Sequence, residues 1–222
     1  MNIVDPAAVI LANGAFPTGE VPLGLLRRAA HLVCCDGAAD KALAHGLEPE
    51  VVVGDLDSIS DAARAQLGKR VRHVGEQETN DLSKAYRYCR ARGWRNLAIV
   101  GAVGGRTDHA LANLSLVVDF SRAEKKPSDL SVTLYTDDGL FTAADRSTVF
   151  ASFRGQQVSI FSFEPGVKVY GEGLKYPLDQ VDFTRWWNAA LNESLADSFK
   201  LVFSGGPLLV FRTYEAKRER MG

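Results

Sequence analysis

The sequence lacks several features that would place it in a specialised class of protein. It has three cysteines among 222 residues, too few for a disulfide framework, and two of them, Cys34 and Cys35, are adjacent and badly placed to bridge each other. No apolar run approaches the roughly 20 residues of a membrane span, and no secretory leader opens the chain. We therefore expect reduced thiols, a cytoplasmic location and no membrane partner.

An excess of charge of one sign is also missing. The 26 basic and 27 acidic residues give a formal net charge of −1, so the overall balance does not indicate nucleic acid as a partner. Hydrophobic residues make up 46% of the chain, which suffices for one large domain or two small ones. Any strong electrostatic field must therefore be local.

Two common nucleotide-binding signatures are absent. The chain has no G-x-x-x-x-G-K-[ST] element and no G-x-G-x-x-G after its first apolar run. If phosphates bind, we expect acidic residues to hold them through a metal ion, with basic side chains completing the charge balance.

The first half of the sequence alternates short apolar runs with helical patterns. The apolar runs are 7–12, 31–35, 51–53 and 97–100, and the helical stretches are 23–30, 38–45, 60–67 and 81–92. This alternation predicts an α/β domain with a mostly parallel, doubly wound sheet. Ligands bind at the carboxyl edge of such sheets, so Asn13, Asp36 and the acids after residue 53 can converge there.

A pair of carboxylates follows the apolar run 51–53. Asp55 and Asp57 stand where the backbone leaves the expected strand, and Asp81 opens the next long helical pattern. Carboxylate oxygens in this position suit Mg²⁺, which can hold phosphate oxygens on its other faces. The alternatives are that Asp57 or Ser58 caps the next helix and that Asp81 only complements a helix dipole.

A glycine-rich segment follows the run 97–100. Its three glycines let the backbone approach a ligand closely, and Arg106 then supplies a guanidinium suited to phosphate oxygens. A helical pattern that we expect to be buried begins at once, so Asp108 and His109 are either capping and packing residues or site residues. Lys84 is either a solvated lysine or a partner of the acid three residues before it.

Four elements in this order resemble the thiamine pyrophosphokinases. They are Asp36-Gly37, Gly54-Asp-Leu-Asp-Ser58, Asp81-Leu-Ser-Lys84 and Gly104-Gly-Arg-Thr-Asp-His109. The resemblance spans the whole chain and includes Gly173-Leu-Lys-Tyr-Pro-Leu178. It implies a homodimeric enzyme that transfers the pyrophosphoryl group of ATP to the hydroxyl of thiamine, by displacement at the β-phosphorus, and releases AMP.

The resemblance also implies roles for single residues. Asp55, Asp57 and Asp81 would bind Mg²⁺ and would act in catalysis together with Arg106 and Asp108. The expected nucleotide-binding residues are Asn13, Asp36, Lys84, Arg106 and His109. The expected thiamine-binding residues are Gln77, Asp108, Asn192, Trp186 and Trp187. Asp108 is the first candidate to accept the proton of the alcohol, and Asp81 is the second.

Some positions depart from the family pattern or have a second interpretation. Ala38, Asn80 and Leu191 replace a glycine, a threonine and a serine that the family usually has. Trp186 and Trp187 can offer a π face to the thiamine cation, or can be core or dimer-interface residues. A nucleotide pyrophosphohydrolase and a non-catalytic thiamine or nucleotide sensor are the rival functions.

The composition shifts beyond residue 121. The stretch 121–129 is polar and contains proline, as expected for a linker. Short alternating runs typical of antiparallel strands follow at 132–136, 158–163, 167–170, 199–203 and 208–213. We expect residues 1–126 to form the α/β catalytic domain that binds nucleotide and metal. Residues 127–222 are expected to form an all-β sandwich that contributes to thiamine binding and dimerisation, with a frayed tail at 215–222.

Overall fold

The computed structural model describes residues 5–123, 131–179, 181 and 183–216, which fall into two units. Residues 5–116, 123 and 131–137 form the α/β unit, and residues 117–122 and those from 138 onward form the β unit. Most of the predicted linker, the predicted boundary at residue 126 and positions 217–222 of the predicted tail lie outside the described residues.

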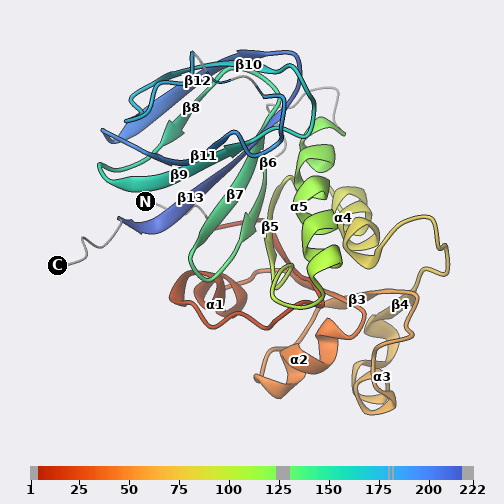
Figure 1. Ribbon diagram of the computed structural model, residues 1–222. Coiled ribbons are helices and arrows are strands. Elements are labelled where there is room, and N and C mark those ends of the chain that lie inside the picture. Colours follow the sequence, from red (N-terminus) through yellow and green to blue (C-terminus); the bar gives the residue numbers. More distant parts are fainter. Residues whose placement is uncertain (1–4, 124–130, 180, 182, 217–222) are drawn as a thin grey trace. The chain divides into compact units, whose positions relative to one another are not determined.

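The α/β unit is built on a parallel sheet of six strands (Figure 1). In spatial order these are β6 (Ser131–Tyr135), β5 (Asn96–Val100), β1 (Ala8–Leu11), β2 (Leu32–Cys35), β3 (Val51–Gly54) and β4 (Val71–His73). The strands β1, β2 and β3 are buried along their whole length. Strands covered on both faces have continuous apolar sequences, which explains the runs that predicted them.

Helices alternate with these strands as predicted. They are α1 (Glu20–Arg27), α2 (Ala38–Ala44), α3 (Asp61–Leu67), α4 (Asp81–Ala91) and α5 (Thr107–Arg122), with the short 3₁₀ helix η1 (Gly68–Arg70) after α3. Helix α4 packs on β1, β2 and β3, and α2 packs on β2. The prediction of a mostly parallel α/β sheet is confirmed.

The order of the strands creates a crevice beside β1. The chain places β1 to β4 in one direction across the sheet and then returns to place β5 on the other side of β1. At such a reversal, the loops that follow the two strands run to opposite faces of the sheet. Ligands of open α/β sheets bind in the crevice between these two loops. The loops after β1 and β5 are those that carry Asn13 and Arg106.

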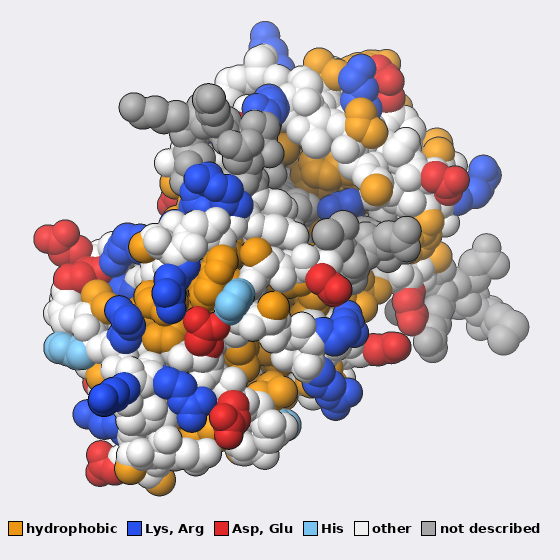
Figure 2. Space-filling view, turned by 180° about the vertical axis from the view of Figure 1, so that it is seen from behind, with side chains coloured by type: hydrophobic (Ala, Val, Ile, Leu, Met, Phe, Trp, Pro, Cys, Tyr) orange, Lys and Arg blue, Asp and Glu red, His pale blue; other side chains and the backbone are white. Residues whose placement is uncertain are grey.

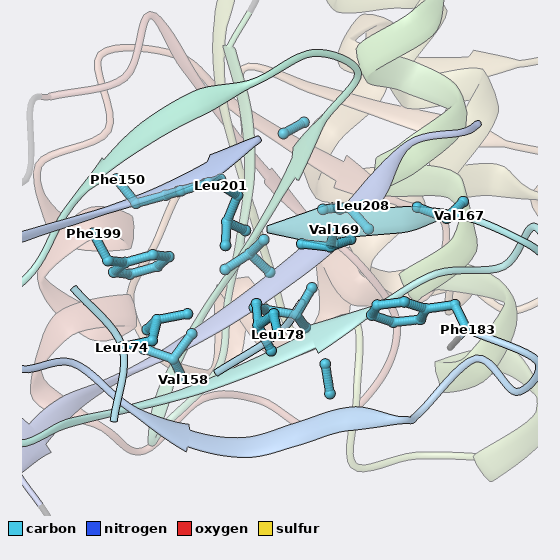
Figure 3. Close-up of a cluster of buried hydrophobic side chains, with 14 residues drawn as sticks. Phe150, Val158, Val167, Val169, Leu174, Leu178, Phe183, Phe199, Leu201 and Leu208 are labelled. Atoms are coloured by element: carbon cyan, nitrogen blue, oxygen red, sulfur yellow. The ribbon is translucent and has the colours of Figure 1, made fainter. Parts of the chain in front are cut away.

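The β unit consists of two antiparallel sheets. One contains β11 (Ala189–Glu193), β9 (Gln156–Phe161), β13 (Leu208–Ala216) and β7 (Gly139–Ala144), and the other contains β10 (Lys168–Glu172), β12 (Ser198–Ser204) and β8 (Thr148–Ala151). Buried side chains from both sheets, such as Phe199 and Leu201 from one and Val158 and Leu208 from the other, form a single cluster (Figure 3). The predicted all-β second half is therefore confirmed.

Two local predictions need correction. The run 132–136 corresponds to β6, and on its β5 side the pairing is parallel rather than antiparallel, with Val132 opposite Leu97. Its residues alternate between buried and less buried, and this pattern resembles that of a sandwich strand. The start of α5 is not buried either: Leu111 is 50% exposed, and the buried apolar side chains of this helix begin at Val117.

The surface agrees with the balanced composition. Figure 2 shows basic and acidic side chains interspersed on the face that it draws. Within the part of the chain that the structure describes, no helix has both the length and the apolar character needed to cross a bilayer.

Candidate active site

The turn after β3 carries Asp55 and Asp57 and is held by a buried acid from the neighbouring strand. Asp36 follows β2, is only 1% exposed and accepts hydrogen bonds from the backbone N–H groups of Ser58 (2.9 Å) and Ile59 (3.1 Å). Asp36 has a φ of +40°, an unfavourable value for a residue with a side chain. The buried carboxylate of Asp36 therefore fixes the backbone of the turn through these two hydrogen bonds.

Three carboxylates gather at this turn. Asp36, Asp55 and Asp57 each offer an oxygen atom, and these atoms all lie within 4.8 Å of one another. A set of oxygen donors of this kind fits Mg²⁺. The sequence predicted Asp81 as the third acid, whereas the cluster found among the described residues contains Asp36 instead. Two of the three predicted ligands are thus brought together directly.

Asp81 is linked to the cluster through Lys84. The Nζ atom of Lys84 lies 3.1 Å from Oδ1 of Asp81 and 4.0 Å from Oδ2 of Asp55. The lysine is only 3% exposed, which rules out the alternative of a solvated side chain on the helix surface. A buried ammonium needs anionic partners, so Lys84 offsets part of the negative charge of the acids.

The neighbouring carboxyl groups perturb each other. Burial raises the pKa of Asp36, and the side chain of Asp57 raises it further. The pKa of Asp57 is lowered by a 2.7 Å hydrogen bond from the hydroxyl of Ser58 and then by Asp36. Adjacent carboxyls with such opposite shifts titrate as a pair.

Capping the next helix was the alternative role for Asp57 or Ser58, but other residues cap the helices. Ser60 caps α3 by accepting a 3.1 Å hydrogen bond from Ala63 N–H, so the cap is neither Asp57 nor Ser58. Asn80, at the position where the family has threonine, caps α4 by accepting a bond from the N–H of residue 83. The departure at residue 80 thus preserves the cap.

The loop after β5 packs tightly against the turn after β1. Gly14 N–H donates to Gly101 O (2.7 Å), and Ala15 N–H donates to Val103 O (2.9 Å). A Cβ atom on Gly14 would lie 2.5 Å from Gly101 O and 2.6 Å from Val103 O, so only glycine fits here. This contact fixes the course of the loop that leads to Arg106.

Arg106 and Asp108 form an exposed ion pair at the start of α5. The guanidinium donates from Nε to Oδ1 (3.1 Å) and from Nη2 to Oδ2 (2.6 Å) of Asp108. Arg106 thereby lowers the pKa of Asp108 to about 2. The same pairing raises the pKa of Arg106, so both groups are charged at neutral pH.

A cavity of about 710 Å³ opens at this edge of the α/β unit. Eight of the predicted site residues line it: Asn13, Asp55, Asp57, Gln77, Asp81, Lys84, Arg106 and His109. Two predicted residues of the α/β unit do not belong to its lining, because Asp36 lies buried behind the turn and Asp108 faces Arg106. The amide of Gln77 donates to Oδ2 of Asp55 (3.2 Å).

Sequence reasoning missed Asn113. This residue of α5 lines the cavity, donates to Ala102 O (2.9 Å) and accepts a 3.3 Å hydrogen bond from Asn80. It therefore ties the start of α4 to the loop after β5. The only signal in the sequence was an isolated asparagine within an apolar helical pattern.

The remaining predicted residues belong to the β unit. Asn192 is 3% exposed, and its amide exchanges hydrogen bonds with the backbone of Tyr176 (3.1 and 2.9 Å). Trp186 and Trp187 are 46% and 49% exposed and line a second cavity of about 400 Å³. They are not core residues of this unit, and contact with thiamine stays a prediction. Leu191, at the position of the family serine, is 79% exposed.

Comparison with families of known proteins gives a consistent result. The model described as "Thiamin pyrophosphokinase, catalytic domain" matches residues 23–128, and the model described as "Thiamin pyrophosphokinase, substrate-binding domain" matches residues 139–211. Thiamin pyrophosphokinase 1 of Caenorhabditis elegans is 31% identical over 105 residues, which cover 43% of either chain. Thiamine pyrophosphokinase 1 of Oryza sativa subsp. japonica is 25% identical over 213 residues, covering 80% of this chain and 75% of the relative.

Solved structures share the fold. Thiamin pyrophosphokinase from Candida albicans superposes with a TM-score of 0.74 at 14% identity, over 94% of this chain and 89% of the other. Thiamine pyrophosphokinase from Bacillus subtilis superposes with a TM-score of 0.74 at 20% identity, over 93% and 98% of the two chains.

Proposed function

The chain belongs to the thiamin pyrophosphokinase family, and from this premise we propose that it transfers the pyrophosphoryl group of ATP to the hydroxyl of thiamine. The products are thiamine diphosphate and AMP. The observation that carries the proposal is the single cavity lined by Asp55, Asp57 and Asp81 together with the cationic Lys84 and Arg106. Pyrophosphoryl transfer needs this combination, because the protein must align the reactants and compensate negative charge.

Asp55, Asp57 and Asp81 are the proposed ligands of Mg²⁺, and Asp36 is the residue that holds the turn of Asp55 and Asp57. Both oxygens of Asp36 already accept backbone hydrogen bonds, which favours this division of roles. A divalent ion held by carboxylates supplies positive charge to phosphate oxygens. Lys84 lies between Asp55 and Asp81, so its ammonium is placed to offset the negative charge of these acids and of a bound nucleotide.

Arg106 is the proposed contact to the transferred group. Its guanidinium is 72% exposed at the cavity and already binds one oxyanion, the Asp108 carboxylate, in a bidentate manner. A phosphate oxygen pair offers the same geometry. When Arg106 turns to phosphate, the pKa of Asp108 rises towards its ordinary value. Asp108 is the proposed acceptor of the alcohol proton, with Asp81 as the alternative.

Further proposals concern the residues that contact the nucleotide and thiamine, the oligomeric state and the location of the protein. Asn13, His109 and Lys84 are the proposed nucleotide contacts of the cavity. Gln77 and a half-exposed indole of Trp186 or Trp187 are proposed to contact thiamine, since a π face attracts a cation by ~0.5–2 kcal/mol. A homodimer follows from the family resemblance, and a cytoplasmic location is consistent with cysteines that are all free and buried.

One incubation tests the reaction. The pure protein is mixed with ATP, Mg²⁺ and thiamine, and the products are identified by mass spectrometry. Thiamine diphosphate and AMP are the expected products. Thiamine monophosphate and ADP would mean that a different phosphorus is attacked, and AMP release without thiamine would identify a pyrophosphohydrolase. Binding without turnover would identify a sensor.

A further inference from the structure

Lys41 holds the backbone of the turn that follows β1. This residue lies on α2, and its Nζ atom donates to the carbonyl oxygens of Gly14 (2.6 Å) and Asn13 (3.1 Å). Burial lowers the pKa of Lys41. Among the ion pairs that join described residues, none includes Lys41, so its ammonium is directed at the two carbonyl groups. Lys41 is not part of the cavity lining, but Asn13 and Gly14 are.

The opposite side of the same turn rests on the glycine-rich loop. Besides the two backbone hydrogen bonds of Gly14 and Ala15, a Cβ atom on Gly105 would lie 3.2 Å from the Cα atom of Gly14. No side chain separates the two segments at this point, so a shift of the turn must move the loop. Residue 105 directly precedes Arg106.

We propose that Lys41 is a positioning residue, which fixes the turn at Asn13 and Gly14 and, through this turn, the loop that carries Arg106. The physical basis is a continuous series of short contacts from the ammonium to the loop backbone. The inference deepens the proposed function and rests on it, because the group positioned in this way is the proposed contact for the transferred phosphates.

Two substitutions of Lys41 separate positioning from general stabilisation. Lys41→Met removes the donors but keeps an aliphatic side chain, and Lys41→Arg restores donors at a similar length. Lys69→Met, which removes an exposed lysine from η1, is the matched control. Each protein is characterised by thermal unfolding, by amide hydrogen exchange without ligands, and by the KM and kcat for ATP and thiamine.

In Lys41→Met we expect the amides of Gly14 and Ala15 to exchange at least about tenfold faster, because loss of charged donors loosens the turn. We expect the KM for ATP to rise about tenfold, with the KM for thiamine unchanged. Lys41→Arg should recover most of both effects, and Lys69→Met should match the wild type.

Three results would overturn the proposal. One is unchanged exchange at Gly14 and Ala15 in Lys41→Met. Another is an equal change in the KM values for ATP and thiamine together with a lower melting temperature, which would show a general structural role. The third is a failure of Lys41→Arg to recover either effect. If the wild-type protein forms no thiamine diphosphate, the proposed reaction fails, whereas the exchange data still decide whether Lys41 holds the turn.

Discussion

At the scale of single residues, acids of the same chemical type have different surroundings and therefore different tasks. Asp36 is buried and satisfied by backbone N–H groups, whereas Asp57 is exposed to the cavity and receives one hydroxyl hydrogen bond. Removal of Asp36 would release the turn, since its hydrogen bonds hold that backbone. Removal of the charge of Asp57 would leave the backbone in place.

Asp57→Asn should therefore abolish turnover without unfolding the protein. We expect kcat to fall at least about a hundredfold, as when other preorganised charge-stabilising groups are removed, and the melting temperature to stay close to that of the wild type. Asp61→Asn, at an exposed acid in the first turn of α3, is the matched control. Near wild-type AMP formation by Asp57→Asn would remove this residue from the mechanism.

The pH dependence of the reaction tests the role of Asp108. Arg106 lowers the pKa of Asp108 to about 2 in the ligand-free protein, so Asp108 is already ionised throughout the range from pH 4 to pH 9. The profile of kcat/KM reports groups of the free enzyme. Any acid limb above pH 4 in that profile must come from another group and should persist in Asp108→Asn. Loss of that limb in Asp108→Asn would show that Asp108 titrates near neutrality.

The sequence predicted eight of the residues that line the cavity but not their contacts. Asp55 and Asp57 were predicted because a pair of acids at a strand end can hold a metal ion, and the family resemblance added Asp81 to them. The placement of Asp36 behind the turn, and the burial of Lys84 between two acids, depend on how separate segments pack. Local sequence patterns contain no information about such packing. The sequence therefore could not distinguish a solvated Lys84 on the helix surface from a buried Lys84 in an ion pair.

At the scale of secondary-structure elements, the start of α1 depends on a residue far away in the sequence. The N-cap residue Gly19 makes no side-chain cap hydrogen bond, and the carboxylate of Asp137 binds the backbone at this cap. Its carboxylate accepts from Gly19 N–H (2.9 Å), Thr18 N–H (3.0 Å) and the hydroxyl of Thr18 (2.6 Å). The helix that follows β1 is thereby attached to the end of β6.

Replacement of Asp137 by alanine should destabilise the protein by about 1 kcal/mol at pH 7, the usual cost of a lost N-cap. Burial opposes ionisation, but the hydrogen bonds from Thr18 and Gly19 outweigh it, so the pKa of Asp137 is lowered in the folded protein. A group with a lowered folded pKa stabilises above its unfolded value, about 3.9, and this stability is lost as the pH falls through the folded pKa.

Urea unfolding at pH 7 and pH 3 measures this difference. The stability gap between wild type and Asp137→Ala should shrink at pH 3, while Asp145→Ala, at an exposed acid between β7 and β8, should leave stability unchanged at both values. An equal gap at pH 7 and pH 3 would mean that the charge of Asp137 does not contribute to the cap.

Elements were predicted best where burial makes their sequence continuous. The strands β1, β2, β3 and β5 were found from apolar runs, whereas the edge strand β4 was missed, because two of its three residues are exposed and charged or polar. Edge strands are commonly short and charged, which prevents pairing with other chains. The strand β6 was found, but its parallel pairing with β5 was not, since the direction of pairing depends on the neighbouring strand and not on the strand's own sequence.

At the scale of the whole molecule, the near-zero net charge allows the effect of a cation bound at one site to be measured without a large general effect of salt. The net charge of −1 means that added salt has little overall field to screen, while the acids around the turn after β3 are concentrated in one place. A divalent ion that binds there stabilises the folded protein by mass action. The gain is about 2.7 kcal/mol when the ion is at a hundredfold excess over its Kd.

Mg²⁺ should therefore raise the melting temperature of the wild-type protein at pH 7, relative to the same buffer with a chelator. In Asp57→Asn the increase should be lost, because the donor set is incomplete. Without Mg²⁺ this variant should melt close to the wild type, since Asp57 is exposed and Asp36 holds the backbone of the turn. Asp61→Asn should keep the full increase. An equal increase in Asp57→Asn would place the ion elsewhere in the molecule and would leave the acids of the cavity without the metal role proposed for them.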